Sequence, residues 1–321
     1  MQGGAGCEAR GVLRPYVAAP RERANAADGP FSAACEQPEA AMTTVLTVLV
    51  ENTVPGKADG LMGEHGFSLL LERPDRRILF DTGAGAALLH NAPRLGKDLR
   101  SVDAIVLSHG HKDHTGGLVA ALGAIGKPVP VYGHPGIFAD RFGKRADGTL
   151  RYAGCPFKRE ALEGMGAAFD LSPAFREIAR GVHVTGEVPR RSGYETGDAH
   201  LFVPRGNGLE PDPFQDDLSM VLEGAHGLTL ILGCCHSGLI NTMDHVRDRL
   251  PGKPIHTVIG GTHLGFAPQD QLRRTIAILR ERQVRRLGLS HCTGLQAGAR
   301  LAAEFGDAVA FCNVGYSLTI D

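Results

Sequence analysis

The chain has 321 residues, of which 43% are hydrophobic and 21% are charged, and its formal net charge at pH 7 is -1. This is the composition of a globular protein with a large buried core, and the near-zero charge provides no basic field for nucleic acid or an anionic membrane. The longest apolar runs are far shorter than the roughly 20 residues that a membrane-spanning helix needs.

The first 41 residues are rich in Gly, Ala, Arg and Pro and show neither helical nor strand periodicity. We expect them to be poorly ordered, with residues 42–321 forming one domain. The segment lacks the apolar core of a secretory signal, and Met42 is a candidate start of translation because it directly precedes the first strand-like run.

The chain has seven cysteines, an odd number with no CxxC pair, which favours a reducing, cytoplasmic setting.

Short apolar runs that alternate with Gly-rich turns predict strands along most of the chain. We expect strands at 44–51, 67–72, 77–81, 103–108, 129–132, 182–185, 218–223, 228–233, 255–259, 285–289 and 308–312. Helices are expected at 84–95, 116–123, 241–250 and 268–282. Segment 140–181 shows no clear period and predicts an irregular insertion over one edge. Two blocks of strands followed by helices predict an α/β fold in which two sheets pack face to face with helices outside.

Three histidines and an aspartate are crowded into SHGHKDHTGG: His109, His111, Asp113 and His114. They follow the apolar run DAIVLS, which predicts a buried strand ending at Ser108, and they precede a helix expected to begin at Thr115 or Gly116. A loop at a strand end can aim all four side chains into one pocket, which a regular helix or strand does not do at these spacings. Imidazole and carboxylate are ligands of zinc and of other first-row divalent ions. The stretch therefore predicts a metal site, with zinc favoured and manganese or iron as alternatives.

The same stretch matches the HxHxDH signature of the metallo-β-lactamase superfamily, and ILFDTG at 78–83 matches its first motif. The chain resembles this superfamily over nearly all of 43–321. The resemblance implies a four-layer αββα sandwich that holds two divalent ions. It implies that His109 and His111 hold the first ion, that Asp113 and His114 hold the second, and that Asp81 braces the loop.

Several shorter stretches resemble one subgroup of the superfamily: VLVENTV, EHGFSLLLE, LGCCHSGLINT, GGTHL and SHCTG. This subgroup includes the archaeal 7,8-dihydropterin-6-ylmethyl-4-(β-D-ribofuranosyl)aminobenzene 5'-phosphate synthase and many hydrolase-like bacterial proteins. The resemblance implies either hydrolase or pterin-forming chemistry.

The remaining metal ligands are expected on later strand ends. His291, after the strand at 285–289, fits the last histidine of the second site. Superfamily strands usually end in Gly-Asp at the bridging position, whereas LTLILGCCHSG ends with His236 and carries no carboxylate. Asp216 or Asp217, in PFQDDLSMVLE, lies where a histidine would be expected. The two ligand types are therefore predicted to exchange places, with Asp216 as a ligand or a brace, and three candidates for the bridging position remain open.

Two further histidines are candidates for substrate binding. His263, in GGTHLG, is expected to bind a substrate anion or to supply a proton in catalysis. His65, in GEHGF, lies on a loop that is expected to overhang the metals. The other histidines are expected to be ordinary surface or core residues: His90, His134, His183, His200, His226, His245 and His256.

Three cysteines flank the proposed ligands. Alternation along a strand predicts that Cys235 and Cys292 turn away from the metals, and Cys234 is expected to be a small buried thiol.

The expected activity is that of a binuclear metal-dependent hydrolase. A metal-bound water, oriented by Asp113 and losing its proton to it, would attack a small ester, phosphoester or other anionic metabolite as hydroxide. One alternative is a transferase that joins a dihydropterin methyl diphosphate to an arylamine, and another is a non-catalytic metal-binding scaffold. We expect a small-molecule anionic substrate and neither a nucleic-acid nor a membrane partner, while the sequence leaves the oligomeric state open.

Overall fold

Two seven-stranded sheets form the centre of the fold in this computed structural model, which describes residues 43–57 and 60–321. The expectations for the first 41 residues and for Met42 therefore lie outside the described residues. The first sheet has the order β18 (Ser317–Ile320), β1 (Thr44–Val50), β2 (Ser68–Glu72), β3 (Arg77–Phe80), β4 (Ala104–Val106), β5 (Val129–Gly133) and β8 (Ala167–Leu171). The second has the order β17 (Val309–Phe311), β16 (Arg286–Ser290), β15 (Ile255–Gly261), β14 (Gly227–Leu232), β13 (Met220–Gly224), β10 (Val182–Val184) and β9 (Arg176–Ala179).

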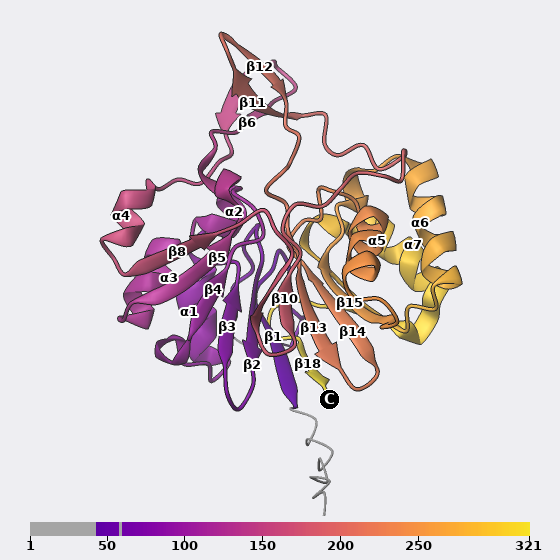
Figure 1. Cartoon of the computed structure of the whole chain (residues 1–321), viewed down its shortest axis with the longest axis horizontal. Coiled ribbons are helices and arrows are strands. Elements are labelled where there is room, and N and C mark those ends of the chain that lie inside the picture. Colours follow the sequence, from indigo (N-terminus) through magenta and orange to yellow (C-terminus); the bar gives the residue numbers. More distant parts are fainter. Residues whose placement is uncertain (1–42, 58–59) are drawn as a thin grey trace, which may run out of the picture. The chain divides into compact units, whose positions relative to one another are not determined.

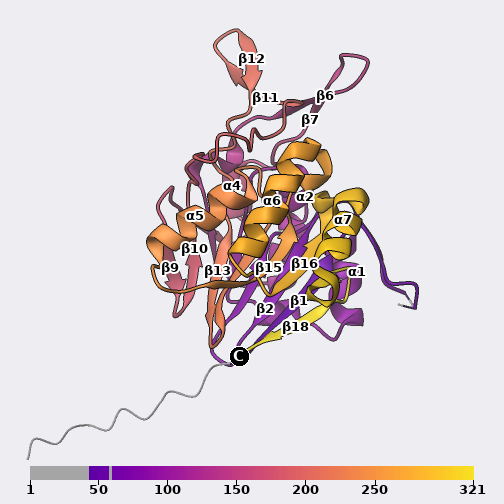
Figure 2. The same cartoon turned by 90° about the vertical axis from the view of Figure 1, so that its right-hand side faces the viewer.

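Helices cover the outer face of each sheet, as Figure 1 shows. The first sheet carries α1 (Ala87–Arg94), α3 (Leu118–Ile125) and the short α4 (Arg159–Glu163), and the second carries α5 (Leu239–Arg249), α6 (Gln269–Glu281) and α7 (Leu295–Phe305). In Figure 2, α5, α6 and α7 lie in front of the second sheet. The predicted four-layer αββα sandwich is confirmed. No helix in the described part of the chain has both the length and the apolarity to cross a membrane.

The strand sequences explain the layers. Both faces of each sheet are covered, so the strands are nearly continuous apolar runs and not alternating ones. In β3, Ile78 and Phe80 face the core between the sheets, where they pack with Met220 and Ile231 from the second sheet. Leu79 points the other way, into the core beneath the helices of the first sheet. Because successive side chains of a strand point to opposite faces, β3 contributes residues to both cores.

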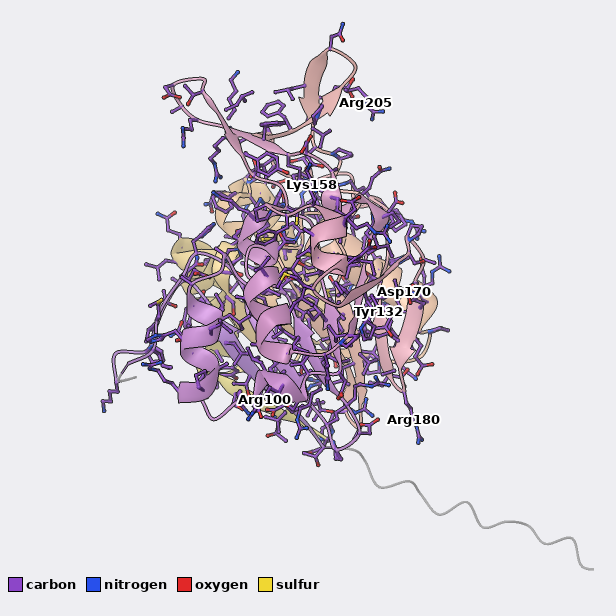
Figure 3. The ribbon with its side chains drawn as sticks, turned by 90° about the vertical axis from the view of Figure 1, so that its left-hand side faces the viewer. Arg100, Tyr132, Lys158, Asp170, Arg180 and Arg205 are labelled. Carbon is purple, nitrogen blue, oxygen red and sulfur yellow. The ribbon has the colours of Figure 1, made fainter. Side chains whose placement is uncertain are left out.

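Segment 140–181 is more regular than its sequence predicted. It contains β6 (Phe142–Lys144), β7 (Leu150–Tyr152), α4, β8 and β9. Strand β8 extends the first sheet by pairing with β5, so that Tyr132 and Asp170 lie side by side, as labelled in Figure 3. Strands β6 and β7 join β11 (Leu201–Arg205) and β12 (Gly208–Pro211) in a small third sheet, of which β12, β11 and β6 are labelled at the top of Figure 1.

Four other elements were not predicted, namely the strands β11 and β12, the helix α7 and the C-terminal strand β18. The histidine loop also differs from the expectation, because a one-turn helix, α2 (Lys112–Thr115), begins before Thr115 and carries Asp113 and His114. Short 3-10 turns complete the structure at Leu99–Ser101, Pro135–Phe138, Leu264–Phe266, His291–Thr293 and Gly306–Ala308.

Candidate metal centre

The candidate site lies where strands of both sheets end. Strands β3 and β4 run parallel in the first sheet, and β14, β15 and β16 run parallel in the second. Parallel strands place their carboxyl ends together, and the loops that follow them are a common position for ligand sites. The residues directly after these five strands, or within a few positions of them, supply the site: Asp81, His109, Cys234, His263 and His291.

Three buried imidazoles form one group of possible metal ligands, which we call the first triad: His109, His111 and His236. Nε2 of His109 lies 3.0 Å from Nδ1 of His111, and one nitrogen from each of the three rings falls within 4.8 Å of the others. Burial lowers the pKa of all three, that of His111 to about 3. The rings are therefore neutral and keep a lone pair for a metal ion.

The first triad also leaves buried nitrogen atoms without partners. Nε2 of His111 and both ring nitrogens of His236 have no hydrogen-bond partner among the described residues. Buried polar atoms in proteins are almost always bonded, so such atoms need an explanation. A bound cation would satisfy nitrogen atoms at this position, and the first triad therefore fits a metal ion.

A second group, the second triad, contains Asp113, His114 and His291. Oδ2 of Asp113 lies 3.4 Å from Nε2 of His291 and 3.8 Å from Nε2 of His114. Burial alone would raise the pKa of Asp113, but the neighbouring imidazoles hold it well below its usual range. His65 approaches the same carboxylate oxygen at 3.2 Å, from a side chain that is 70% exposed. We call the six residues of the two triads the donor cluster.

Asp81 orients two of these imidazoles from behind. Its Oδ1 accepts the backbone N–H of Ser108, and its Oδ2 accepts from the Ser108 hydroxyl and from Nδ1 of His114, each at 2.7 Å. The Ser108 Oγ in turn accepts from Nδ1 of His109 at 2.8 Å. Because an ionised carboxylate only accepts, both Nδ1 atoms donate away from the site and both Nε2 atoms face it. Burial lowers the pKa of His114, but Asp81 and Asp113 raise it to about 9, so His114 must give up its Nε2 proton to bind a metal ion.

His291 is oriented by two residues at the end of β1. Glu51 accepts the backbone N–H of His291 at 2.7 Å, and Oδ1 of Asn52 lies 2.9 Å from Nδ1 of His291. The same Oδ1 accepts from the backbone N–H of Gly66, so the ring nitrogen must be its donor. This leaves Nε2 of His291 facing Asp113. No role was predicted for Glu51 and Asn52, although two polar residues at the end of a buried strand were a signal.

Asp216 and Asp217 lie outside the groups of clustered metal-binding atoms found among the described residues. Oδ2 of Asp216 accepts from the backbone N–H of Gly110, and its Oδ1 is 2.6 Å from Nη2 of the buried Arg141. Asp217 accepts from the backbone N–H of Ser237. The two carboxylates therefore hold the loops that carry the first triad.

His263 lies beside the first triad and is paired with a carboxylate that the sequence analysis did not single out. Its Nε2 is 3.4 Å from Oδ2 of Asp198, and its ring centroid is 4.4 Å from that of His236. Burial alone would lower the pKa of His263, but Asp198 and Cys292 together raise it to about 9. His263 therefore carries a proton at neutral pH in the metal-free protein.

The three cysteines have three different environments. Sγ of Cys234 is 3.2 Å from Nε2 of His114, inside the centre. Cys235 turns away and contacts Thr242 in the core beneath the helices of the second sheet, as predicted. The prediction for Cys292 is wrong, because residues 291–293 form a 3-10 turn in which strand alternation does not hold, and its thiol lines the site.

A cavity of about 240 Å³ opens above the centre. Members of both triads line it, together with His65, Asp198 and His263. Its outer wall comes partly from the third sheet and carries three cations, Lys112, Lys144 and Arg151, which we call the cationic rim. None of the three forms an ion pair with another described residue. His200, expected to be an ordinary histidine, also lines the cavity.

Comparisons with known proteins agree with this geometry. The family model of the metallo-beta-lactamase superfamily matches residues 61–241. The chain belongs to this superfamily. It is 30% identical over 250 residues to the 7,8-dihydropterin-6-methyl-4-(beta-D-ribofuranosyl)-aminobenzene-5'-phosphate synthase of Methanocaldococcus jannaschii, a match that covers 75% of this chain and 85% of that protein.

Solved structures place this superfamily member in the same fold. The crystal structure of Tm1679, described as a metal-dependent hydrolase of the beta-lactamase superfamily, matches with a TM-score of 0.73 and 26% identity, covering 86% of this chain and 98% of that one. Zn²⁺-bound PqqB from Methylobacterium extorquens shares the fold at a TM-score of 0.52 and 15% identity, with 85% and 99% of the two chains covered. Family and donor cluster together indicate divalent-metal binding.

Proposed function

We propose that this protein is a binuclear metal-dependent hydrolase that acts on a small ester, phosphoester or other anionic metabolite in the cytoplasm. The observation that carries the proposal is the donor cluster, whose oriented imidazoles and carboxylate converge on one cavity. Divalent ions bound there would supply a water that ionises near neutral pH and a positive charge on the bond under attack.

Each residue of the site has a role that follows from its position. The first triad would hold one ion and the second triad the other. Asp113, whose Oδ2 faces His114 and His291, would take the proton of the attacking water on its Oδ1. His263, protonated and held by Asp198, would donate its proton to the leaving group from the cavity wall.

The charges around the cavity support an anionic substrate. The acids that line it are Asp113 and Asp198, and both already face histidines. The cationic rim has no such partners among residues 43–57 and 60–321 and can face a phosphate or carboxylate on the substrate. Lys144 and Arg151 come from β6 and β7, so the third sheet would contribute to substrate choice. A small molecule with a terminal phosphate at one end and a scissile bond at the other fits this distribution.

The test is an activity panel on zinc- or manganese-loaded full-length protein, with phosphodiesters, phosphomonoesters and lactones as substrates. We expect hydrolysis of at least one anionic class, abolished by chelation and restored by metal. The hydrolase proposal fails if the loaded protein turns over none of them but condenses a dihydropterin methyl diphosphate with an arylamine.

That second reaction is the alternative function, and the 30% identity to the archaeal synthase favours it. The cationic rim fits a diphosphate leaving group as well as a phosphate ester. The two activities differ in the nucleophile, because an arylamine replaces water. Product analysis in the presence of both substrates, with and without the arylamine, therefore separates them.

A further inference from the structure

One thiol lies between the two triads. Cys234 is 4% exposed, directly follows Gly233 after β14, and its Sγ is 3.2 Å from Nε2 of His114. Its Sγ also lies within 4.8 Å of metal-binding atoms in three separate groups, which contain His109, His236 and His291 in turn. The thiol is therefore close to two members of the first triad and two members of the second.

We infer that the Cys234 thiolate is a shared ligand that bridges the two metal positions. The inference rests on the proposed function, because it requires that the triads hold metal ions. It assigns the bridging position, which in the superfamily is usually an aspartate after a Gly-ended strand, to the sulfur of the residue that follows Gly233. On binding, the Cys234 S–H proton leaves to solvent as the sulfur–metal bonds form.

The separations fit sulfur ligation. A zinc ion binds sulfur at about 2.3 Å and imidazole nitrogen at about 2.0–2.1 Å, so two such ligands of one ion lie at most about 4.4 Å apart. The 3.2 Å between Cys234 Sγ and His114 Nε2 is inside that limit. A thiolate has lone pairs for two ions, as a carboxylate has, and is a soft ligand that suits zinc.

The backbone fixes the thiol at this position. A Cβ atom on Gly233 would lie 2.1 Å from the Ser108 hydroxyl and 3.0 Å from the Asp81 carboxylate. The backbone just after β14 therefore lies so close to Ser108 and Asp81 that only a glycine fits at position 233. The next side chain along, that of Cys234, then reaches the space between the triads.

The neighbouring cysteines provide matched controls. Cys235 is adjacent in sequence but contacts Thr242 in the core. Cys292 accepts the backbone N–H of His263 at 3.3 Å and shares only one group of candidate ligand atoms, with Cys234 and His291. Three single Cys→Ser variants therefore test a bridging thiol, a thiol at the wall and a core thiol.

The experiment is zinc X-ray absorption spectroscopy, with metal counting, on zinc-loaded full-length protein. We expect a sulfur scatterer at about 2.3 Å in the wild type, retained in Cys235→Ser and Cys292→Ser and lost in Cys234→Ser. Zinc content should fall from two ions toward one in Cys234→Ser and return to two, without sulfur, in Cys234→Asp.

The outcomes separate the inference from the function beneath it. Wild-type protein that binds two zinc ions with only nitrogen and oxygen neighbours overturns the bridging thiolate and leaves the hydrolase proposal standing. Sulfur lost only in Cys292→Ser also overturns it. Wild-type protein that binds less than one zinc ion per chain overturns the proposed function itself. If Cys234→Ser does not fold, the wild-type, Cys235→Ser and Cys292→Ser spectra still decide the assignment by elimination.

Discussion

Unusual backbone conformations gather at the metal centre. Within the described chain, six non-glycine residues have positive φ, and Asp81, Cys235, His263 and His291 are among the five that lie at or beside the centre. The fifth is Phe214, whose ring stacks on His236 with centroids 4.3 Å apart. A left-handed conformation costs an L-residue about 1–2 kcal/mol, and such residues concentrate at functional sites. Asp81, His263 and His291 turn the chain just after β3, β15 and β16, and the side chains of the two histidines line the cavity.

Asp81 offers the most direct test of the orienting network. In Asp81→Asn the side chain loses the charge that accepts from Ser108 and His114, so the His114 ring is no longer fixed in the required tautomer. We expect zinc affinity to fall about 10- to 100-fold while the fold is kept. Competition with a chromophoric chelator measures this. Asp103→Asn removes an acid at the far end of β4, where it accepts the Arg77 backbone N–H and lies 3.8 Å from Nζ of Lys127, and should leave the affinity unchanged.

His263 can be tested through the leaving group. If it donates a proton, His263→Gln should lower kcat about 100-fold for substrates with an alkoxide leaving group. With a nitrophenolate leaving group, which departs without a proton, the loss should be small. Steady-state kinetics on the two matched substrates give the answer, and an equal loss on both would show that His263 has no role as an acid.

At the scale of elements, we expect the third sheet to set substrate specificity. Its strands β6, β7 and β11 are short and supply Gly143, Lys144, Arg151 and Leu201 to the cavity wall. Backbone pairing holds Gly143 opposite Arg151. The candidate metal ligands follow strands of the two large sheets, so we expect changes in this small sheet to alter substrate binding without disturbing the donor cluster.

We therefore expect Lys144→Ala and Arg151→Ala each to raise KM for a phosphorylated substrate by about fivefold, the effect of losing one exposed ion pair, with kcat little changed. KM for an uncharged ester should not move. Lys158→Ala removes an exposed lysine at the start of α4, away from the cavity, and serves as the control. A rise in KM for the uncharged ester as well would contradict the electrostatic explanation.

At the scale of the whole molecule, the sandwich could be predicted because the buried strands and the histidine loop each have a recognisable sequence pattern. Strands covered on both faces became long apolar runs, and four histidine or aspartate residues within six positions marked the metal loop. The third sheet has no such pattern. Every residue of β12 is exposed, so this strand needs no apolar residues. Two polar residues at the end of a buried strand mark Glu51 and Asn52 as unusual, but their contacts with His291 span about 240 positions, so no local pattern identifies the partner.

Metal removal should act on the stability of the entire sandwich. Ligands of the donor cluster come from both sheets, so a bound ion stabilises the folded chain and not the unfolded one. At free zinc 100 times above Kd, linkage gives about 2.7 kcal/mol, which corresponds to a rise in Tm of about 5 °C or more. Calorimetry of chelator-treated and zinc-loaded protein measures it. Equal melting temperatures would contradict a centre that joins the two sheets.

The donor cluster takes its residues from both halves of the chain, and this determines when zinc can bind during folding. Residues 109–114 follow β4, while His236 and His291 follow strands more than 120 positions later, so neither half of the chain presents a complete triad. High-affinity zinc capture must then wait until the two halves have docked. The rate at which a refolding sample takes up zinc would report that docking step directly, in a protein whose sequence contains no tryptophan to follow by fluorescence.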